Sequence, residues 1–301
     1  MVRLRIPASS ANMGPGFDTL GVALNLYNRL EIEEIPEGLV IETLNPKGFT
    51  PKDENNLIYR AAMNVFEYTD YKVKGIKIRQ NSAIPMTRGL GSSSACIIGG
   101  MLAANVISGR KLTYREILNL AAKIEGHPDN VAPALYGGFC VSVFDGEKAW
   151  CKSTKLNPDI KFAVMIPDYF VATKKSREVL PEQIPFKDAV YNVSRASLLQ
   201  AALTCGDMSV LKEAVGDKLH QQYRKSYIDG FDNIVEKTYQ IGARATYLSG
   251  SGPTIVSIID SNPSEFNAQM KNFFKENSHD WVCMILSTDN VGAVVSEVNT
   301  F

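Results

Sequence analysis

The sequence predicts an α+β fold in two domains, with helices on one face of largely antiparallel sheets. The chain has 301 residues, more than one hydrophobic core usually spans, which favours two domains of roughly 150 residues each. Segments with strand-like alternation are interspersed with segments of helical periodicity along the whole chain. No Pro-, Gly- or Ser-rich linker marks the boundary, so the pattern alone places the predicted domains at 1–155 and 156–301.

In the first domain, apolar residues at every second position predict strands, and apolar residues three and four apart predict helices. The predicted strands are 2–6, 21–35, 40–43, 76–80, 138–144 and 148–153. The predicted helices are 56–66, 93–107 and 114–124. Thr113 is the predicted N-cap of the third helix, because Glu116 follows it by three residues as in a capping box.

The second domain opens with an apolar run at 162–166, followed by predicted helices at 189–203 and 208–215. Two apolar segments near its end, 254–259 and 282–287, are predicted strands. The segment between them is amphipathic, with apolar residues at Phe266, Met270, Phe273 and Phe274. The second half therefore mixes helices and strands as the first does.

Composition excludes several classes of protein. Hydrophobic residues make up 45% and charged residues 21% of the chain, as in ordinary globular proteins. Lysine plus arginine equal aspartate plus glutamate at 32 each, so the basic field typical of nucleic-acid binders is absent. The N-terminus lacks a signal-peptide pattern, and the weakly polar run 95–109 is too short to span a bilayer. We expect a cytoplasmic protein without nucleic-acid or membrane partners.

Cysteine and histidine usage argues against a structural metal. The five cysteines are odd in number, widely spaced and lack the paired spacing of zinc ligands. We interpret them as small core residues of a protein in a reducing compartment. The histidines are scattered at His127, His220 and His279, and we interpret the last two as polar surface or capping residues.

The most specific motif lies between a predicted strand and a long apolar helix. It consists of Pro85, Met86, Thr87, Arg88, Gly89, Leu90, Gly91, Ser92, Ser93, Ser94 and Ala95. Gly89 and Gly91 allow a tight turn and close approach of a ligand, and the N–H groups that open the helix suit a phosphate. The serine hydroxyls could cap the helix, bind phosphate oxygens or ligate Mg²⁺.

Alone, this motif fits two interpretations. It contains neither the Gly-Lys-Ser/Thr of a Walker A loop nor the Gly-x-Gly-x-x-Gly of a dinucleotide fingerprint. The glycines, the serines and the start of the helix are consistent with a triphosphate site. The same residues are equally consistent with a structural glycine turn followed by serine N-caps.

Two further segments are rich in turn formers. Residues 7–21 lie between two predicted strands and form either a long hairpin or a binding loop, whose polar Asn12 and Asp18 suit a substrate with hydroxyl and amino groups. Residues 248–254 contain Gly250 and Gly252, which could bring the backbone close to a substrate or to the first segment. Each segment by itself also fits a purely structural role.

Taken together, the three motifs resemble those of the GHMP kinases in kind and in order. Within that family the resemblance is to the branch that acts on homoserine, through residues 7–21, 125–138, 173–181 and 192–195. It covers essentially the whole chain. It implies an N-terminal ATP-binding domain like ribosomal protein S5 domain 2, a C-terminal ferredoxin-like domain, and an active site between them.

The resemblance also implies a reaction and its participants. L-homoserine and MgATP would give O-phospho-L-homoserine and ADP, a step of threonine biosynthesis, in a cytoplasmic homodimer. ATP would lie on the turn 85–95, and Mg²⁺ would bind Ser93 and Glu125. The implied substrate-binding residues are Asn12, Asp18, His127, Asn130, Thr173, Arg177, Arg224 and Gly252. The implied catalytic residues are Asp18, Glu125, Asp129 and Asn130.

Several of these roles have alternatives. Glu125 also fits a solvated carboxylate at a helix end, and Arg195 and Arg224 each fit either a ligand contact or a structural salt bridge. Asp129 lies where other family members have a catalytic aspartate, but the loop after Glu125 is shorter than is common in the homoserine branch, which leaves its alignment open. We favour direct phosphoryl transfer, which needs no strong base.

The resemblance leaves two other functions open. One is a GHMP kinase with a mevalonate, sugar or polyol substrate, since the shape of the pocket cannot be deduced from sequence. The other is a non-catalytic ATP-binding regulator of the same fold, which would be marked by loss of the phosphate turn or of the Mg²⁺-binding oxygens. Both features are present here.

Overall fold

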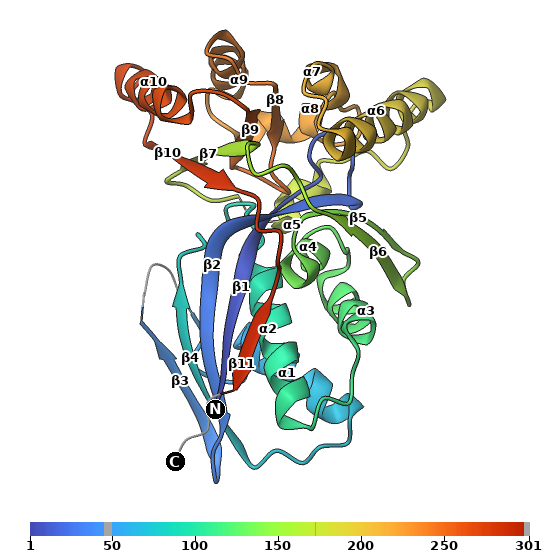
Figure 1. Cartoon of the computed structure of the whole chain (residues 1–301), viewed down its shortest axis with the longest axis vertical. Helices are drawn as coiled ribbons and strands as arrows, with labels where there is room; N and C mark the ends of the chain where they lie inside the picture. Colours follow the sequence, from blue (N-terminus) through green and yellow to red (C-terminus); the bar gives the residue numbers. More distant parts are fainter. Residues whose placement is uncertain (45–49, 172, 298–301) are drawn as a thin grey trace.

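The computed structural model describes residues 1–44, 50–171 and 173–297, and of residues 173 and 174 it describes only the backbone. The chain forms two sheets, one above the other in Figure 1, each covered by helices. In the described residues no helix is both long and apolar enough to cross a bilayer.

The first sheet has seven strands. Its main path runs β11-β1-β2-β4-β3, while β5 pairs with β2 and with β6. All its pairings are antiparallel except β3 with β4. The strands are β1 (Val2–Ala11), β2 (Leu20–Glu34), β3 (Gly38–Thr43), β4 (Gly75–Ser82), β5 (Phe139–Phe144), β6 (Ala149–Thr154) and β11 (Val294–Glu297).

Four helices cover one face of this sheet (Figure 1). They are α1 (Leu57–Tyr68), α2 (Ser92–Ile107), α3 (Tyr114–Glu125) and α4 (Val131–Tyr136). The central helix α2 contacts β1, β2, α1, α3 and α4, and nearly all its residues after the first turn are buried. A helix that is apolar all round belongs in a core. Because α2 is buried there, its N-terminus and the turn at residues 85–95, called the phosphate turn below, are held in a fixed place.

The second sheet follows the order β10-β7-β9-β8 with antiparallel pairs. Numbered within this sheet, the order is fourth-first-third-second strand, which is the ferredoxin-like arrangement. The strands are β7 (Lys161–Pro167), β8 (Ala245–Leu248), β9 (Ile255–Ile259) and β10 (Trp281–Ser287). Its helical elements are α5 (Thr173–Glu178), α6 (Phe186–Cys205), α7 (Leu211–Ala214), α8 (Gln221–Arg224), the 3₁₀ turn η1 (Lys225–Tyr227), α9 (Phe231–Gln240) and α10 (Pro263–Glu276).

The predicted α+β class and the ferredoxin-like second half are confirmed. The boundary at residue 155 stays a prediction: β6 ends at Thr154 and β7 opens the second sheet at Lys161, but the chain returns to the first sheet through β11, which pairs with β1. Residues from both ends of the chain therefore build the first sheet.

The predicted capping box is present: the Thr113 side chain accepts from the Glu116 N–H, and the Glu116 carboxylate accepts from the Thr113 N–H. The predicted strand 2–6 is too short, because the turn formers that follow Ile6 continue β1 to Ala11 with a register shift after Pro7. Residues 7–21 thus form both a hairpin and a connecting loop, 12–19. The predicted helix 208–215 is wrong over its first part, where Asp207 accepts from the Ser209 N–H in a turn, so that only α7 is helical.

The sequence analysis did not predict several elements, among them α4, α5, α8 and α9. The helix α9 begins after Gly230, which offers no side-chain cap, but Phe231, Ile234, Val235 and Thr238 have helical spacing that could have indicated it. The short strands β8 and β11 have four residues each, too few to establish a period of two.

Candidate active site

The turn before α2 has the backbone that its glycines suggest. Thr87, Gly89 and Gly91 have φ angles of 54°, 74° and 67°, in the left-handed region. Gly91 is the N-cap of α2 and offers no side-chain cap, so Ser92 to Ser94 form the first turn of the helix and do not cap it. Their N–H groups have no partner within the helix, and such an uncapped first turn attracts anions.

The two glycines are required by the protein's own packing. A Cβ on Gly89 would lie 2.3 Å from the Ser249 carbonyl oxygen, and a Cβ on Gly91 would lie 1.9 Å from the Ser9 Oγ. The close approach of a ligand stays a prediction, and the missing side chains also let the turn contact β1 and the segment after β8.

Hydrogen bonds join the three motifs into one structure. Ser249 Oγ donates to the Gly89 carbonyl at 2.6 Å and lies 2.8 Å from Ser10 Oγ. Asn12 Nδ2 donates to the Gly250 carbonyl at 2.9 Å, and the Gly250 N–H donates to the Ala11 carbonyl. Contact with the first segment, one of the two roles open for the glycines of residues 248–254, is present in the structure, and approach to a substrate stays a prediction.

A cleft of about 280 Å³ opens beside the turn. It brings together most of the residues predicted for the site: Asn12, Asp18, Met86, Thr87, Arg88, Gly89, Leu90, Gly91, Ser92, Ser93, Glu125, His127, Asp129, Asn130, Arg177 and Arg224. Pro85, Ser94, Ala95 and Gly252 do not line it, and Ser94 and Ala95 are fully buried. The side chain of Thr173 lies outside the described residues.

The cleft also extends beyond these residues. Its other lining residues are Thr50, Pro51, Asn56, Leu57, Ile58, Gln80, Cys96, Gly250 and Ser251. Sequence reasoning missed them apart from Gly250 and Ser251, which belong to the segment 248–254. Gln80 carried a signal: it continues the inward positions of Ile76 and Ile78 on β4, where a polar side chain is unusual. Its Nε2 donates to Asn28 Oδ1 at 3.2 Å.

Ser93 and Glu125 meet at the start of α2. Ser93 Oγ donates to Glu125 Oε2 at 3.0 Å, joining the first turn of α2 to the last residue of α3. Burial raises the pKa of Glu125 above its ordinary value, and the nearby Asp129 adds to this, while His127 and Ser93 oppose it. The Ser93 hydroxyl and the Glu125 carboxylate are hard oxygen donors beside an anion site, and such a pair can bind a Mg²⁺ ion.

His127, Asp129 and Asn130 form a second polar group on the loop between α3 and α4. His127 Nδ1 lies 2.5 Å from Asp129 Oδ1, and Asn130 Oδ1 accepts from Ser9 Oγ at 2.8 Å. Burial disfavours the charged imidazole, but the hydrogen bond and charge of Asp129 raise the pKa of His127. Ligand atoms of Asp18, His127 and Asp129 lie within 4.8 Å of one another, so the three side chains face the same part of the cleft.

Asp18 and Arg177 pair with each other across the cleft. Arg177 Nη2 donates to Asp18 Oδ1 at 2.8 Å and Nη1 to Oδ2 at 3.1 Å. This bidentate contact joins the connecting loop 12–19, called the N-terminal loop below, to α5. The Arg177 guanidinium also lies 5.5 Å from the centre of the Phe17 ring. Both side chains are partly exposed, so a zwitterionic ligand can replace either partner.

Arg224 is the buried cation of the site. Its side chain is 3% exposed, and Nε and Nη1 donate to the carbonyls of Ser176 and Gly250 at 3.0 Å each. Burial and then the charge of Arg177 lower the pKa of Arg224 to about 10. Among the ion pairs of the described residues none involves Arg224, whereas Arg195 stacks on Tyr191 away from the cleft.

One expectation about the histidines is wrong. His220 is fully buried, because both ring nitrogens find partners inside the protein, Gly14 O at 2.8 Å and Arg224 Nη1 at 3.3 Å. Although it stands at the N-cap position of α8, its side chain does not cap the helix. His279 is half-buried, 3.8 Å from Asp229.

Known proteins resemble this chain along its whole length. Models of the GHMP kinase N-terminal and C-terminal domains match residues 56–138 and 196–276. Homoserine kinases of Clostridium beijerinckii and Caldicellulosiruptor bescii are 46% and 45% identical, covering 99% and 100% of this chain and 99% and 98% of their own. The crystal structure of homoserine kinase from Cytophaga hutchinsonii superposes with a TM-score of 0.87 at 28% identity, covering 98% of this chain and 97% of that one. The chain therefore belongs to the GHMP kinase family and, within it, to the homoserine kinases.

Proposed function

We propose that this protein transfers the γ-phosphoryl group of MgATP to the side-chain hydroxyl of L-homoserine, giving O-phospho-L-homoserine and ADP. Its relatives at about 45% identity over the full chain are named homoserine kinases. The cytoplasmic location and the homodimer implied by the family stay predictions.

The observation that supports this substrate best is the buried guanidinium of Arg224. A buried charge without an ionic partner is costly, and proteins retain one where a ligand supplies the counter-charge. Arg224 lines the cleft, Arg177 adds a second guanidinium, and no carboxylate of the described residues lies within 4 Å of Arg224. A substrate carboxylate would supply the missing counter-charge of Arg224 and could also accept a hydrogen bond from Arg177, which favours an acid over a sugar or a simple polyol.

The amino group of the substrate distinguishes homoserine from a hydroxy acid such as mevalonate. An ammonium group needs acceptors, and the cleft offers the carboxylates of Asp18 and Asp129 together with Asn12 Oδ1. Asn12 Oδ1 already accepts from the Asp18 N–H at 3.0 Å, which holds the loop in place. The polar half of the cleft is thus suited to a zwitterion.

The other half suits a nucleoside triphosphate. The first turn of α2 presents N–H groups for the phosphates, and Ser93 with Glu125 would hold Mg²⁺, which neutralises phosphate charge when it is bound. Leu57 and Ile58, with the amides of Asn56 and Gln80, line the part of the cleft beyond the turn. An apolar wall with a few amide groups is what a nucleobase requires.

We favour direct transfer without a strong general base. Two carboxylates of the cleft already have partners in the protein, Asp18 in Arg177 and Asp129 in His127. In phosphoryl transfer, alignment and charge neutralisation supply most of the acceleration. Asn130, fixed by Ser9, can orient the substrate hydroxyl.

The test is ADP release from MgATP by the purified protein, followed by a coupled assay, with the product identified by ³¹P NMR as a phosphomonoester. We expect release that depends on L-homoserine. Turnover of mevalonate, a sugar or a cytidyl-diphosphate polyol in place of homoserine would overturn the substrate and keep the kinase. ATP binding without any turnover, unchanged in Ser93→Ala, would instead support a regulator.

A further inference from the structure

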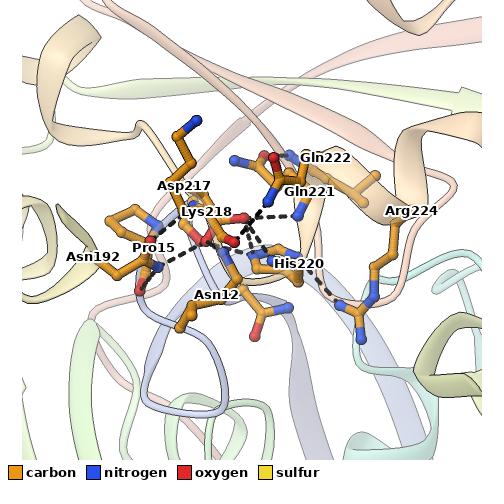
Figure 2. A network of polar contacts seen from close by, with 12 residues as sticks. Asn12, Pro15, Asn192, Asp217, Lys218, His220, Gln221, Gln222 and Arg224 are labelled. Carbon is orange, nitrogen blue, oxygen red and sulfur yellow. Dashed lines mark hydrogen bonds and ion pairs between the residues drawn. The ribbon is translucent and has the colours of Figure 1, made fainter. Parts of the chain in front are cut away.

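A network of buried polar groups lies behind the N-terminal loop (Figure 2). Its centre is Asp217, whose side chain is fully buried. The carboxylate accepts from Asn192 Nδ2 at 2.8 Å and from three backbone N–H groups, those of Leu219, His220 and Gln221, at 2.7 to 2.9 Å. Four donors satisfy a buried carboxylate, so Asp217 serves to fix the start of α8.

The network holds the N-terminal loop at two successive carbonyls. Asn192 Nδ2, on α6, also donates to the Pro15 carbonyl at 3.1 Å, and His220 Nε2 donates to the Gly14 carbonyl at 2.8 Å. Asn12 precedes these two carbonyls in the loop 12–19, and Asp18 follows them. The network therefore fixes the loop between two residues that line the cleft, although His220 itself does not line it.

The partners of His220 determine its tautomer. A carbonyl oxygen only accepts, so the contact with Gly14 requires a proton on Nε2. A guanidinium only donates, so the contact of Nδ1 with Arg224 Nη1, at 3.3 Å, requires a bare Nδ1. Burial lowers the pKa of His220, and the charge of Arg224 lowers it further while Asp217 opposes both. The contact with Arg224 requires the neutral imidazole, and burial favours the same form.

Arg224 depends on that imidazole for its orientation. Among the described residues its hydrogen bonds leave from Nε and Nη1, which leaves Nη2 for the cleft. The Phe17 ring lies 5.2 Å from the guanidinium and 5.4 Å from the His220 ring, so one aromatic ring packs on both. The plane of the guanidinium is therefore set by two carbonyls, one ring and Nδ1 of His220.

We propose that His220 is a positioning residue that orients Arg224 towards the substrate carboxylate and anchors the loop carrying Asn12 and Asp18. The inference rests on the proposed function, because Arg224 needs a carboxylate ligand for its orientation to matter. His220 acts through Arg224 and Gly14 and touches no substrate.

Two variants separate the two contacts. His220→Gln retains a donor towards Gly14 and removes the acceptor for Arg224, while His220→Asn retains an acceptor near Nδ1 and removes the donor. We expect His220→Gln to raise KM for homoserine about tenfold or more, with kcat changed less than about threefold. KM for MgATP should stay unchanged. His279→Gln, at the half-buried histidine remote from the cleft, is the matched control and should change none of these.

A substrate analogue distinguishes positioning from a general loss of structure. L-homoserine amide has a neutral carboxamide in place of the carboxylate. We expect His220→Gln to lower kcat/KM about tenfold for homoserine and to leave kcat/KM for the amide nearly unchanged. Equal losses for both substrates, or no loss for homoserine, would overturn the proposal. A wild-type protein without homoserine-dependent ADP release would instead overturn the proposed function.

A measurement on the unaltered protein keeps the proposal testable if a variant fails to fold. The chain has three histidines, so their ring nitrogens can be assigned by ¹⁵N NMR. We expect a protonated Nε2 and a bare Nδ1 for His220 from pH 6 to 8. A protonated Nδ1 in that range would refute the contact with Arg224 on which the proposal depends.

Discussion

Asp18→Asn separates the stability of the site from its function. Asp18 and Arg177 make a bidentate pair with distances of 2.8 and 3.1 Å, and their side chains are 32% and 41% exposed. The substitution keeps the shape of Asp18 and removes its charge. It therefore leaves Arg177 without its partner and would leave a bound ammonium group with one carboxylate fewer.

The expected effect on stability is small. Ion pairs this exposed are screened by water and contribute up to about 1 kcal/mol to the free energy of unfolding, which corresponds to at most about 2 °C in Tm for a chain of this size. The expected effect on substrate binding is larger. A hydrogen bond to a charged group contributes roughly 1.5–3 kcal/mol, so KM for homoserine should rise about 10- to 100-fold.

Thermal unfolding and steady-state kinetics with homoserine and MgATP check both numbers. Asp260→Asn is the matched control, because Asp260 makes a similar double contact with Arg244 Nε, at 3.1 and 3.0 Å, outside the cleft. It should lower Tm as little and leave KM unchanged. A fall of kcat by about 10² or more in Asp18→Asn would make Asp18 a general base and refute direct transfer, and an unchanged KM would refute its role in binding.

Three further outcomes are expected. Since burial raises the pKa of Glu125, this residue destabilises the fold progressively as the pH rises from the ordinary pKa of a glutamate to the raised one, and fully above it; Glu125→Gln should raise Tm in EDTA at pH 7 yet raise the Mg²⁺ concentration needed for half-maximal rate, and a lower Tm or an unchanged Mg²⁺ dependence would contradict this. Gly91→Ala should cost about 1–3 kcal/mol more stability in urea unfolding than Gly109→Ala, because both glycines have positive φ but only Gly91 has a neighbour, Ser9 Oγ, in the place of a Cβ; equal losses would show that strain alone acts. Burial raises the pKa of Cys96 to about 12, so at pH 8 iodoacetamide should label the exposed Cys205 long before Cys96 in a peptide map, and comparable rates would show that the Cys96 thiol is less buried.

Features that depend on near neighbours in the chain were predictable. The turn at 85–95 combines glycines with a strand before it and an apolar run after it, and the left-handed backbone at Gly89 and Gly91 follows from these letters. The capping box at Thr113 and Glu116 is equally local. The boundaries of longer elements were predictable only in part, as β1 shows by continuing through residues that usually form turns.

Partners distant in the chain were not predictable. Arg177 and Asp18 were both expected to bind the substrate, but nothing in their surroundings indicates that they pair across 159 residues. His220 and His279 both stand among polar residues, yet of these two only His220 is fully buried. This burial was not predictable, because the partner of its ring, Gly14, is 206 residues away in the chain. The glycines of the phosphate turn likewise meet Ser9 and Ser249, which only the packed domains bring near.

The amino-acid sequence alone determined the order of the three motifs, the alternation of helices and strands, and the set of polar side chains available for the site. These depend on backbone propensities and periodicities that act over a few residues. The tertiary structure decided which of those side chains neutralise one another and which stay available to a ligand. Ion pairs and hydrogen bonds require contact within about 4 Å. Only the packing of the two sheets against the loop 12–19 brings Asp18 to Arg177 and leaves Arg224 without a carboxylate that close among the described residues.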